Sequence, residues 1–296
     1  MENNTASRLG LHSIGSLFSD SWKLYKERFG VLTEIMLLPV LVMILAEVLL
    51  SLGSIFILLG LLVLIIGVIA LVFVSIPLIS SIHNNSGVDA SYKNTVPLFW
   101  PFVWMTILTM FAVLGGSFML IIPGIWLAVA LGVARYVFVI EGRLGIDALR
   151  QSKDYIKGYW WAVLGRSLLL GIIVLAAVFV IELPFGALFV IFLGKASAGI
   201  IGFVLTLFYA PFSAVYAYKI FENLRELKPE LAGAQTKEGT GFIKASAIVG
   251  IVAPILLMVL AIVISLFGLF SMIHFTHHSA VPFSGYGNTQ IPSPQP

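Results

Sequence analysis

Long apolar stretches constrain the fold of this chain more than any other feature. A helix that crosses a bilayer needs roughly 20 apolar residues. Seven stretches approach or exceed this length, at about residues 30–52, 55–82, 98–122, 123–140, 161–182, 198–218 and 245–273. Only 10% of the 296 residues are charged, whereas a soluble domain carries about 25%. The sequence therefore predicts an all-α polytopic membrane protein with about six core transmembrane helices and a C-terminal seventh.

The region from Ile121 to Trp161 organises the neighbouring spans. Pro123 and Gly124 predict a helix break near its start, and Glu141 marks the end of the fourth span. The polar segment that follows has helical periodicity, and its apolar face consists of Ile146, Leu149, Ile156 and Trp160. We therefore expect an amphipathic surface helix between the fourth and fifth spans.

Residues 1–29 are predicted to form a second amphipathic helix, because their apolar residues recur at steps of three and four. The apolar face contains Leu11, Ile14, Phe18, Trp22, Tyr25 and Phe29. An aromatic face of this kind is typical of a helix that lies in the membrane surface, although a helix packed on a soluble partner would show the same periodicity.

The distribution of basic residues predicts the orientation of the chain. The segments 1–29, 83–95, 142–160 and 219–244 hold 14 of the 17 Lys and Arg residues, and the opposite connections hold only Lys195. The positive-inside rule then places the N-terminus in the cytoplasm and the C-terminal tail outside a cell membrane. Aromatic anchors at the inner interface are expected from Trp22, Phe29, Trp160 and Trp161.

The chain is predicted to have five parts: the interfacial helix, a six-helix membrane domain, a cytoplasmic linker, an appended transmembrane helix and a disordered tail. They cover residues 1–29, 30–222, 223–244, 245–273 and 274–296. Leu183-Pro184-Phe185 interrupts the fifth apolar run, so residues up to 193 are expected to form a kinked extension or a re-entrant piece.

A shift of 131 residues aligns 18–32 with 149–163, pairing Ser21 with Ser152, Lys26 with Lys157 and Phe29 with Trp160. Either an internal duplication or shared amphipathic constraints would produce this pattern.

Short motifs in the central region resemble the membrane domain of glycerophosphoryl diester phosphodiesterases and of its free-standing bacterial relatives. The matching residues are Pro123, Gly124, Trp126, Glu141, Gly142, Ala148, Leu149, Ser152, Gly158 and Trp160. The resemblance covers roughly residues 13–227 and implies a helical membrane module. The catalytic barrel of the two-part relatives needs about 250 residues, and no soluble segment here is long enough to form it. The resemblance therefore does not imply phosphodiesterase activity.

Four ionisable residues in or at the ends of predicted spans are the candidate polar site, because charges are costly in a bilayer. Glu34 and Arg166 lie at similar depths and are expected to face the bundle interior and to pair. Arg135 lies deeper and needs a partner, which Glu141 could supply if the fourth span bends. These charges either fix helix register as a structural pair or line a polar cavity for a solute or a lipid headgroup.

The sequence contains no cysteine and no recognisable nucleotide-binding, metalloprotease or serine-hydrolase motif. His274, His277 and His278 lack an accompanying acidic ligand, so we expect no metal site. We expect no cofactor, no nucleic-acid partner and no enzymatic activity. The expected role is a membrane-organising, lipid-interacting or partner-scaffolding protein in contact with anionic lipids. The alternative is a small-solute or lipid transporter or channel with a polar site around Glu34, Arg135 and Arg166.

The predicted orientation can be tested by labelling, because a single introduced cysteine will be the only thiol in the chain. A cysteine within 142–160 is expected to react with a membrane-impermeant maleimide in inverted vesicles and not in intact cells. Reaction in intact cells would contradict the orientation.

Overall fold

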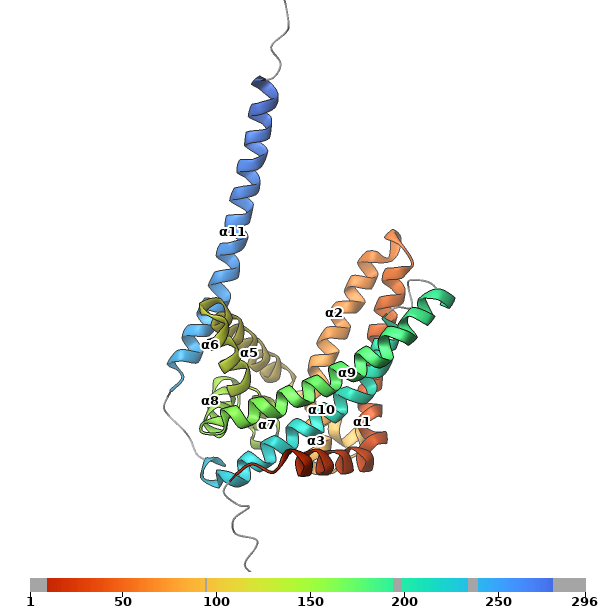
Figure 1. Cartoon of the computed structure of the whole chain (residues 1–296), viewed down its shortest axis with the longest axis vertical. Coiled ribbons are helices and arrows are strands. Elements are labelled where there is room, and N and C mark those ends of the chain that lie inside the picture. Colours follow the sequence, from red (N-terminus) through yellow and green to blue (C-terminus); the bar gives the residue numbers. More distant parts are fainter. Residues whose placement is uncertain (1–9, 94, 194–198, 234–238, 279–296) are drawn as a thin grey trace, which may run out of the picture. The chain divides into compact units, whose positions relative to one another are not determined.

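A computed structural model describes residues 10–93, 95–193, 199–233 and 239–278 (Figure 1). Within this part all regular structure is helical, and the elements are α1 (Ile14–Ser51), η2 (Ser54–Phe56), α2 (Ile57–Phe73), α3 (Ser75–Asn84), α4 (Val88–Lys93), η3 (Val96–Leu98), α5 (Phe99–Met119), α6 (Ile121–Ala130), α7 (Ala134–Glu141), α8 (Gly145–Ile156), α9 (Trp160–Leu193), α10 (Ile200–Leu227), η5 (Pro229–Leu231) and α11 (Gly241–His278). The chain divides into two compact units, Met1–Gly250 and Ile251–Pro296.

Seven helical segments of the described chain are long and apolar enough to cross a membrane. They are Ile14–Ser51, Ser54–Asn84, Val88–Met119, Ile121–Glu141, Trp160–Leu188, Ile200–Leu227 and Gly241–Leu266. Each overlaps one of the seven predicted stretches. Many of their large apolar side chains are exposed, as expected for helices that face lipid. The fold is therefore that of an all-α polytopic membrane protein, as predicted.

The turn between the third and fourth spans lies at Leu120, not at Pro123 and Gly124 as predicted. Leu120 has extended backbone (φ −168°, ψ 153°), and α6 begins at the next residue. Pro123 is in the first turn of α6, where a backbone N–H has no intrahelical partner, so proline is tolerated. Gly124 serves close packing, because a Cβ atom there would lie only 2.8 Å from Cα of Ser117 on α5.

α9 continues as one helix through Pro184 to Leu193, so residues 183–193 extend the fifth helix, which was one of the two predicted alternatives. The first turns of α11, up to Gly250, belong to the first compact unit. Ile243 and Ser246 are buried there. The predicted tail from 279 onward lies outside the described residues, as do the side chains of the three histidines.

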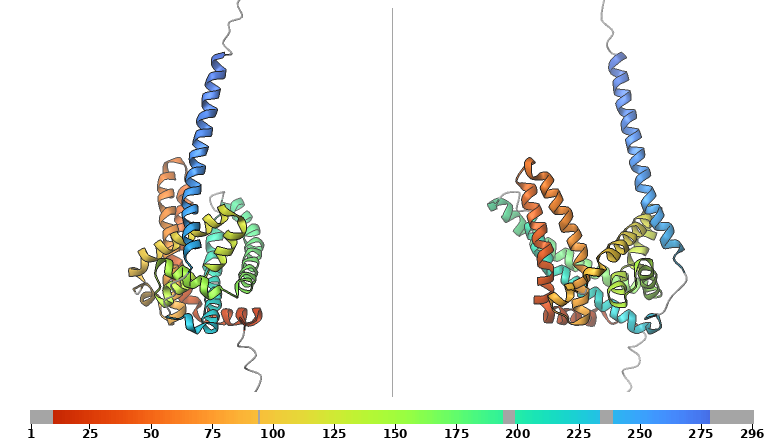
Figure 2. Two further views of the ribbon diagram at one scale, coloured as in Figure 1. Left: turned by 90° about the vertical axis from the view of Figure 1, so that its left-hand side faces the viewer. Right: turned by 180° about the vertical axis from the view of Figure 1, so that it is seen from behind.

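α1 combines the predicted interfacial helix and the first span in one bent helix. Figures 1 and 2 show its first turns, in dark red, running across the direction of the remainder. Ser13 caps the helix by accepting a hydrogen bond from the Ser16 N–H at 3.2 Å. Pro39 lies inside the helix and leaves the Ile35 carbonyl without its usual donor. The Tyr92 hydroxyl donates to that carbonyl at 3.0 Å, which compensates the loss.

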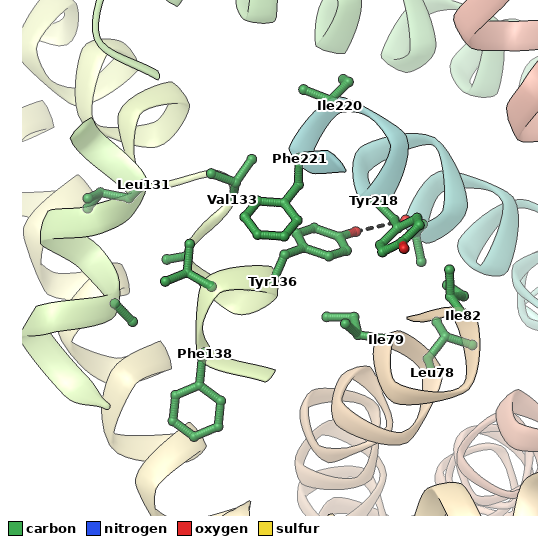
Figure 3. Packing of buried hydrophobic residues seen from close by; sticks show 14 of the residues in the cluster. Leu78, Ile79, Ile82, Leu131, Val133, Tyr136, Phe138, Tyr218, Ile220 and Phe221 are labelled. Atoms are coloured by element: carbon green, nitrogen blue, oxygen red, sulfur yellow. Dashed lines mark hydrogen bonds between the residues drawn. The ribbon is translucent and has the colours of Figure 1, made fainter. Parts of the chain in front are cut away.

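A buried core of the first unit lies where α3, α7, α8 and α10 meet (Figure 3). The Tyr136 ring of α7 stacks on Phe221 of α10, with ring centroids 5.9 Å apart. Tyr155 of α8 meets the same phenylalanine edge-on. α8 is thus amphipathic as predicted, but its apolar side packs on protein and not on the membrane surface, with Leu149 and Ile156 fully buried.

The close approach of α5 and α6 gives a test of the packing. Replacing Gly124 with Ala is expected to lower the free energy of unfolding by about 1–3 kcal/mol, because the new methyl group would collide with the Ser117 Cα atom of the backbone as well as with the Ser117 hydroxyl. Thermal unfolding in detergent, followed by tryptophan fluorescence, measures the effect. Gly165→Ala in α9 is the control, since a Cβ atom at that position would have no neighbouring atom within 4 Å. Equal melting temperatures for the two variants would contradict the packing.

Candidate functional site

The fourth span is broken in the middle, and this break shapes the candidate site. α6 ends at Ala130 and α7 begins at Ala134, with turns at residues 131–133 between them. A break inside a span frees backbone carbonyls that water cannot reach. The Ser152 hydroxyl of α8 donates to the Ala130 carbonyl at 2.9 Å and satisfies one of them. A specific side-chain hydrogen bond therefore stabilises the break.

α7 directs two consecutive side chains to different surroundings. Tyr136 enters the core, where its hydroxyl donates to the Ala214 carbonyl of α10 at 2.8 Å (Figure 3). Arg135 is exposed, and its guanidinium carbon lies 5.3 Å from the Tyr136 ring centroid. Because Tyr136 is fully buried and fixed, the backbone that carries Arg135 is fixed as well.

Two cavities meet at Arg135. The larger, of about 510 Å³, lies between α2, α5 and the α6–α7 break, and the smaller, of about 290 Å³, lies between α1, α3, α7 and α10. Leu71, Ser75 and Arg135 line both cavities. Arg135 is the one charged residue among those that line either cavity in the described chain. No carboxylate of a described residue lies within ion-pairing distance of it.

The other polar groups of the two cavities are mostly hydroxyls that already donate to their own helices. Thr106 and Thr109 of α5 donate to the carbonyls of Phe102 and Met105, at 2.9 and 2.8 Å. Thr206 and Ser213 of α10 do the same at 2.8 and 2.7 Å. These oxygens can therefore only accept further hydrogen bonds, and the guanidinium of Arg135 is the strong donor of the site.

Glu34 and Arg166 do not pair, so this expectation was wrong. Glu34 is exposed on α1. Arg166 instead donates to the carbonyl of His12 at 2.6 Å and to that of Leu11 at 3.3 Å. It also reaches the Ala162 carbonyl of its own helix at 2.9 Å. Arg166 thus holds the segment that leads into α1, because backbone carbonyls there supply the acceptors it needs.

Glu141 is not the partner of Arg135 either. Its side chain is only 5% exposed and accepts a hydrogen bond from the Tyr155 hydroxyl at 2.7 Å. Gln151 of α8 donates to its second oxygen, and Arg225 of α10 approaches to 3.7 Å. Glu141 therefore joins α7, α8 and α10 at the end of the span, and its acceptor capacity is used there.

The four predicted aromatic anchors are all at least partly accessible. Trp22 is 45% exposed, Phe29 37% and Trp161 78%. Trp160 is half-buried, and its indole N–H donates to the Trp126 carbonyl of α6 at 3.2 Å.

Sequence reasoning missed the polar contacts of Arg28, which donates to Ser81, Asn85 and the Ser86 carbonyl around the end of α3. Asn85 has positive φ (52°), a conformation that Asn tolerates at a helix end. The Asn84-Asn85-Ser86 turn was the available signal for this contact. The hydroxyl residues of the cavities were also missed, because isolated Ser and Thr residues in apolar spans give no pattern.

Comparison of the chain with protein-family models, with curated proteins and with solved structures finds no match.

The contact of Tyr155 with Glu141 gives a stability prediction. Tyr155→Phe is expected to lower the free energy of unfolding by about 1.5–3 kcal/mol, because a hydrogen bond to a charged acceptor is lost. Urea or thermal unfolding in detergent measures this difference. Tyr159→Phe, which also removes one hydroxyl, is the control and should cost clearly less.

Comparison of the native protein with Tyr155→Phe also gives a pH prediction. Burial, chiefly, and then the hydrogen bond and charge of Glu141 raise the pKa of Tyr155 above its usual 10.0. The stabilising contribution of the phenol is therefore complete below about pH 10 and declines as the pH rises further, because only the unfolded chain then ionises readily. The stability advantage of the native protein over Tyr155→Phe should narrow above pH 10. A constant difference would contradict the assignment.

Proposed function

We propose that this protein is a non-catalytic, lipid-interacting membrane protein that holds an acidic amphiphile at Arg135. One observation carries the proposal: a single arginine, without a carboxylate partner among the described residues, is shared by two cavities in the membrane-spanning region. The ligand class is a lipid or fatty acid with a carboxylate or phosphate group.

The charge of Arg135 supports an anionic ligand. An arginine within a span is costly unless an anion, a carbonyl cluster or water satisfies it. Its planar guanidinium presents paired donors that match a carboxylate or phosphate in bidentate geometry. The accepting hydroxyls of Thr106 and Thr109 cannot replace such a ligand, since they are neutral and mainly serve their own helix.

The walls of the cavities support an apolar tail. The larger cavity is lined by Val68, Leu71 and Val72 of α2, and by Met105 and Met110 of α5. Its volume of about 510 Å³ falls within the ~300–1,000 Å³ usual for ligand sites. Methionine side chains adapt to flexible apolar groups, as an acyl chain requires.

The depth of Arg135 fits a headgroup near one membrane surface. Arg135 lies six positions before Glu141, which corresponds to about 9 Å along a helix. With the N-terminus in the cytoplasm, this surface is that of the inner leaflet of a cell membrane. The resemblance to phosphodiesterase membrane domains implies a helical membrane module without a catalytic barrel, which agrees with a non-catalytic role. A role as a scaffold for a protein partner is compatible with the same resemblance.

The broken fourth span favours transport as a second candidate function. Discontinuous helices are common at the substrate sites of transporters, where the ends of the half-helices face the substrate. Here the break at 131–133 adjoins both cavities. A transporter would pass the acidic ligand, or a small anionic solute, between its two cavities.

Arg135→Gln is the decisive variant for the lipid proposal. Native mass spectrometry of the detergent-purified protein is expected to show retained acidic lipid or fatty acid in the native chain. Retention should fall by roughly 10- to 100-fold in the variant, because a charge-assisted hydrogen bond contributes about 1.5–3 kcal/mol. Arg135→Lys should recover only part of it, since the bidentate geometry is lost.

Arg143→Gln is the matched control, because it removes the same charge from the loop after α7 and leaves the cavities intact. Equal lipid retention in Arg135→Gln and Arg143→Gln would overturn the proposal. Liposome uptake of an acidic lipid or solute that Arg135→Gln abolishes would identify the second candidate function.

A further inference from the structure

A third cavity lies at the junction of α8 and α9; Trp126, Ala130 and Trp160 of its lining belong to candidate membrane spans, and its other lining residues lie outside them. It has a volume of about 670 Å³ and is bordered by the end of α8, the start of α9, one turn of α6 and the residues after α10. Its side chains combine lysines with indoles, and they include Trp126, Lys153, Lys157, Trp160 and Lys228. None of these residues belongs to the Arg135 cavities.

The walls of the cavity are held together by hydrogen bonds from two side chains. The Trp160 indole N–H donates to the Trp126 carbonyl at 3.2 Å and ties the start of α9 to α6. The Lys228 ammonium donates to the carbonyls of Asp154 and Lys157, each at 2.6 Å, and closes the C-terminal end of α8. Lysine commonly binds the free carbonyls at a helix end. Lys228 and Trp160, whose hydrogen bonds hold the walls of the cavity together, therefore form the frame of the cavity.

The remaining lysines are not required by the frame. Lys153 donates to the Gly239 carbonyl at 2.7 Å, which leaves two of its three N–H donors available. Lys157 is exposed. Together with Lys228 they give three ammonium groups, against the two carboxylates of Asp154 and Glu230. The carbonyl contacts do not neutralise any of these charges, so the cavity keeps an excess of positive charge.

Burial lowers the pKa of Lys228, whereas the nearby Glu230 and Asp154 raise it and Lys157 lowers it further. An anion placed in the cavity would relieve the repulsion between Lys157 and Lys228.

The neighbouring indoles favour a position of the cavity near the membrane surface. Tryptophan prefers the boundary between lipid and water, because one end of its ring system is apolar and its N–H is polar. Trp161, next to Trp160, is 78% exposed at the start of the α9 span. We therefore expect the lysines to lie near the depth of lipid phosphates and the spans beyond them at the depth of acyl chains.

We propose that this lysine–indole cavity binds the phosphate of an anionic membrane lipid. Lys153 and Lys157 would contact the phosphate, Lys228 would add charge from the frame, and Trp160 would lie against the glycerol and acyl region. The site is independent of the Arg135 cavities. Phosphate binding at this site explains why lysines and tryptophans that lie far apart in the sequence line one cavity.

The test measures binding of dihexanoyl phosphatidic acid to the purified full-length protein in an uncharged detergent by calorimetry. The Arg135→Gln background removes any contribution from the Arg135 cavities. Lys153→Gln/Lys157→Gln in that background should weaken binding at least tenfold, since each basic group near an anionic lipid surface contributes appreciably to the binding free energy. Lys153→Arg/Lys157→Arg should restore most of it, which separates a charge effect from a folding defect.

Lys23→Gln/Lys26→Gln is the matched control, because it removes two exposed lysines from the first turns of α1. Its affinity should stay within twofold of the Arg135→Gln background. An equal loss in both double variants would show diffuse surface charge and would overturn the site. Inorganic phosphate that binds as tightly as the lipid would assign the cavity to a soluble phosphate and overturn the lipid. Binding of dihexanoyl phosphatidylcholine with equal affinity would overturn the requirement for an anion.

Discussion

Backbone carbonyls that lack a helical N–H partner determine much of this structure. Inside a membrane, water is not at hand to satisfy such groups, so side chains must do so. Four such carbonyls accept a hydrogen bond from a side chain of another segment. The donors and their carbonyls are Tyr92 with Ile35, Ser152 with Ala130, Arg166 with His12, and Lys228 with Lys157. These contacts join residues that are distant in the sequence.

The spans could be predicted from the sequence because length and apolarity are local properties. The amphipathic character of α8 was also predicted correctly, but its surroundings were not. Periodicity shows that a helix has an apolar face and does not show whether lipid or protein covers it. Pro123 was similarly ambiguous, because proline breaks a helix interior but fits its first turn. The chain turned at Leu120, a residue without any turn signal.

The candidate site was only half predictable for a related reason. The cost of charge in a bilayer singled out Glu34, Arg135, Glu141 and Arg166. Their partners depended on how the helices pack, which no local pattern encodes. Glu141 found donors on α8 and α10, and Arg166 found carbonyls ahead of α1. Arg135 instead lines two cavities. Glu141 and Arg166 therefore hold helices and segments together, whereas Arg135 is a candidate ligand contact.

The position of Arg135 on α7 has a consequence for ligand binding. The helix has eight residues and is bounded by the 131–133 turns and by Gly142, whose φ is 67°. It is therefore a short segment between two breaks in the helix. Tyr136 connects this segment to α10, and Arg135 lines both cavities. Because one guanidinium with a fixed set of N–H donors borders both cavities, a ligand that takes these donors from one cavity leaves fewer of them for a ligand in the other.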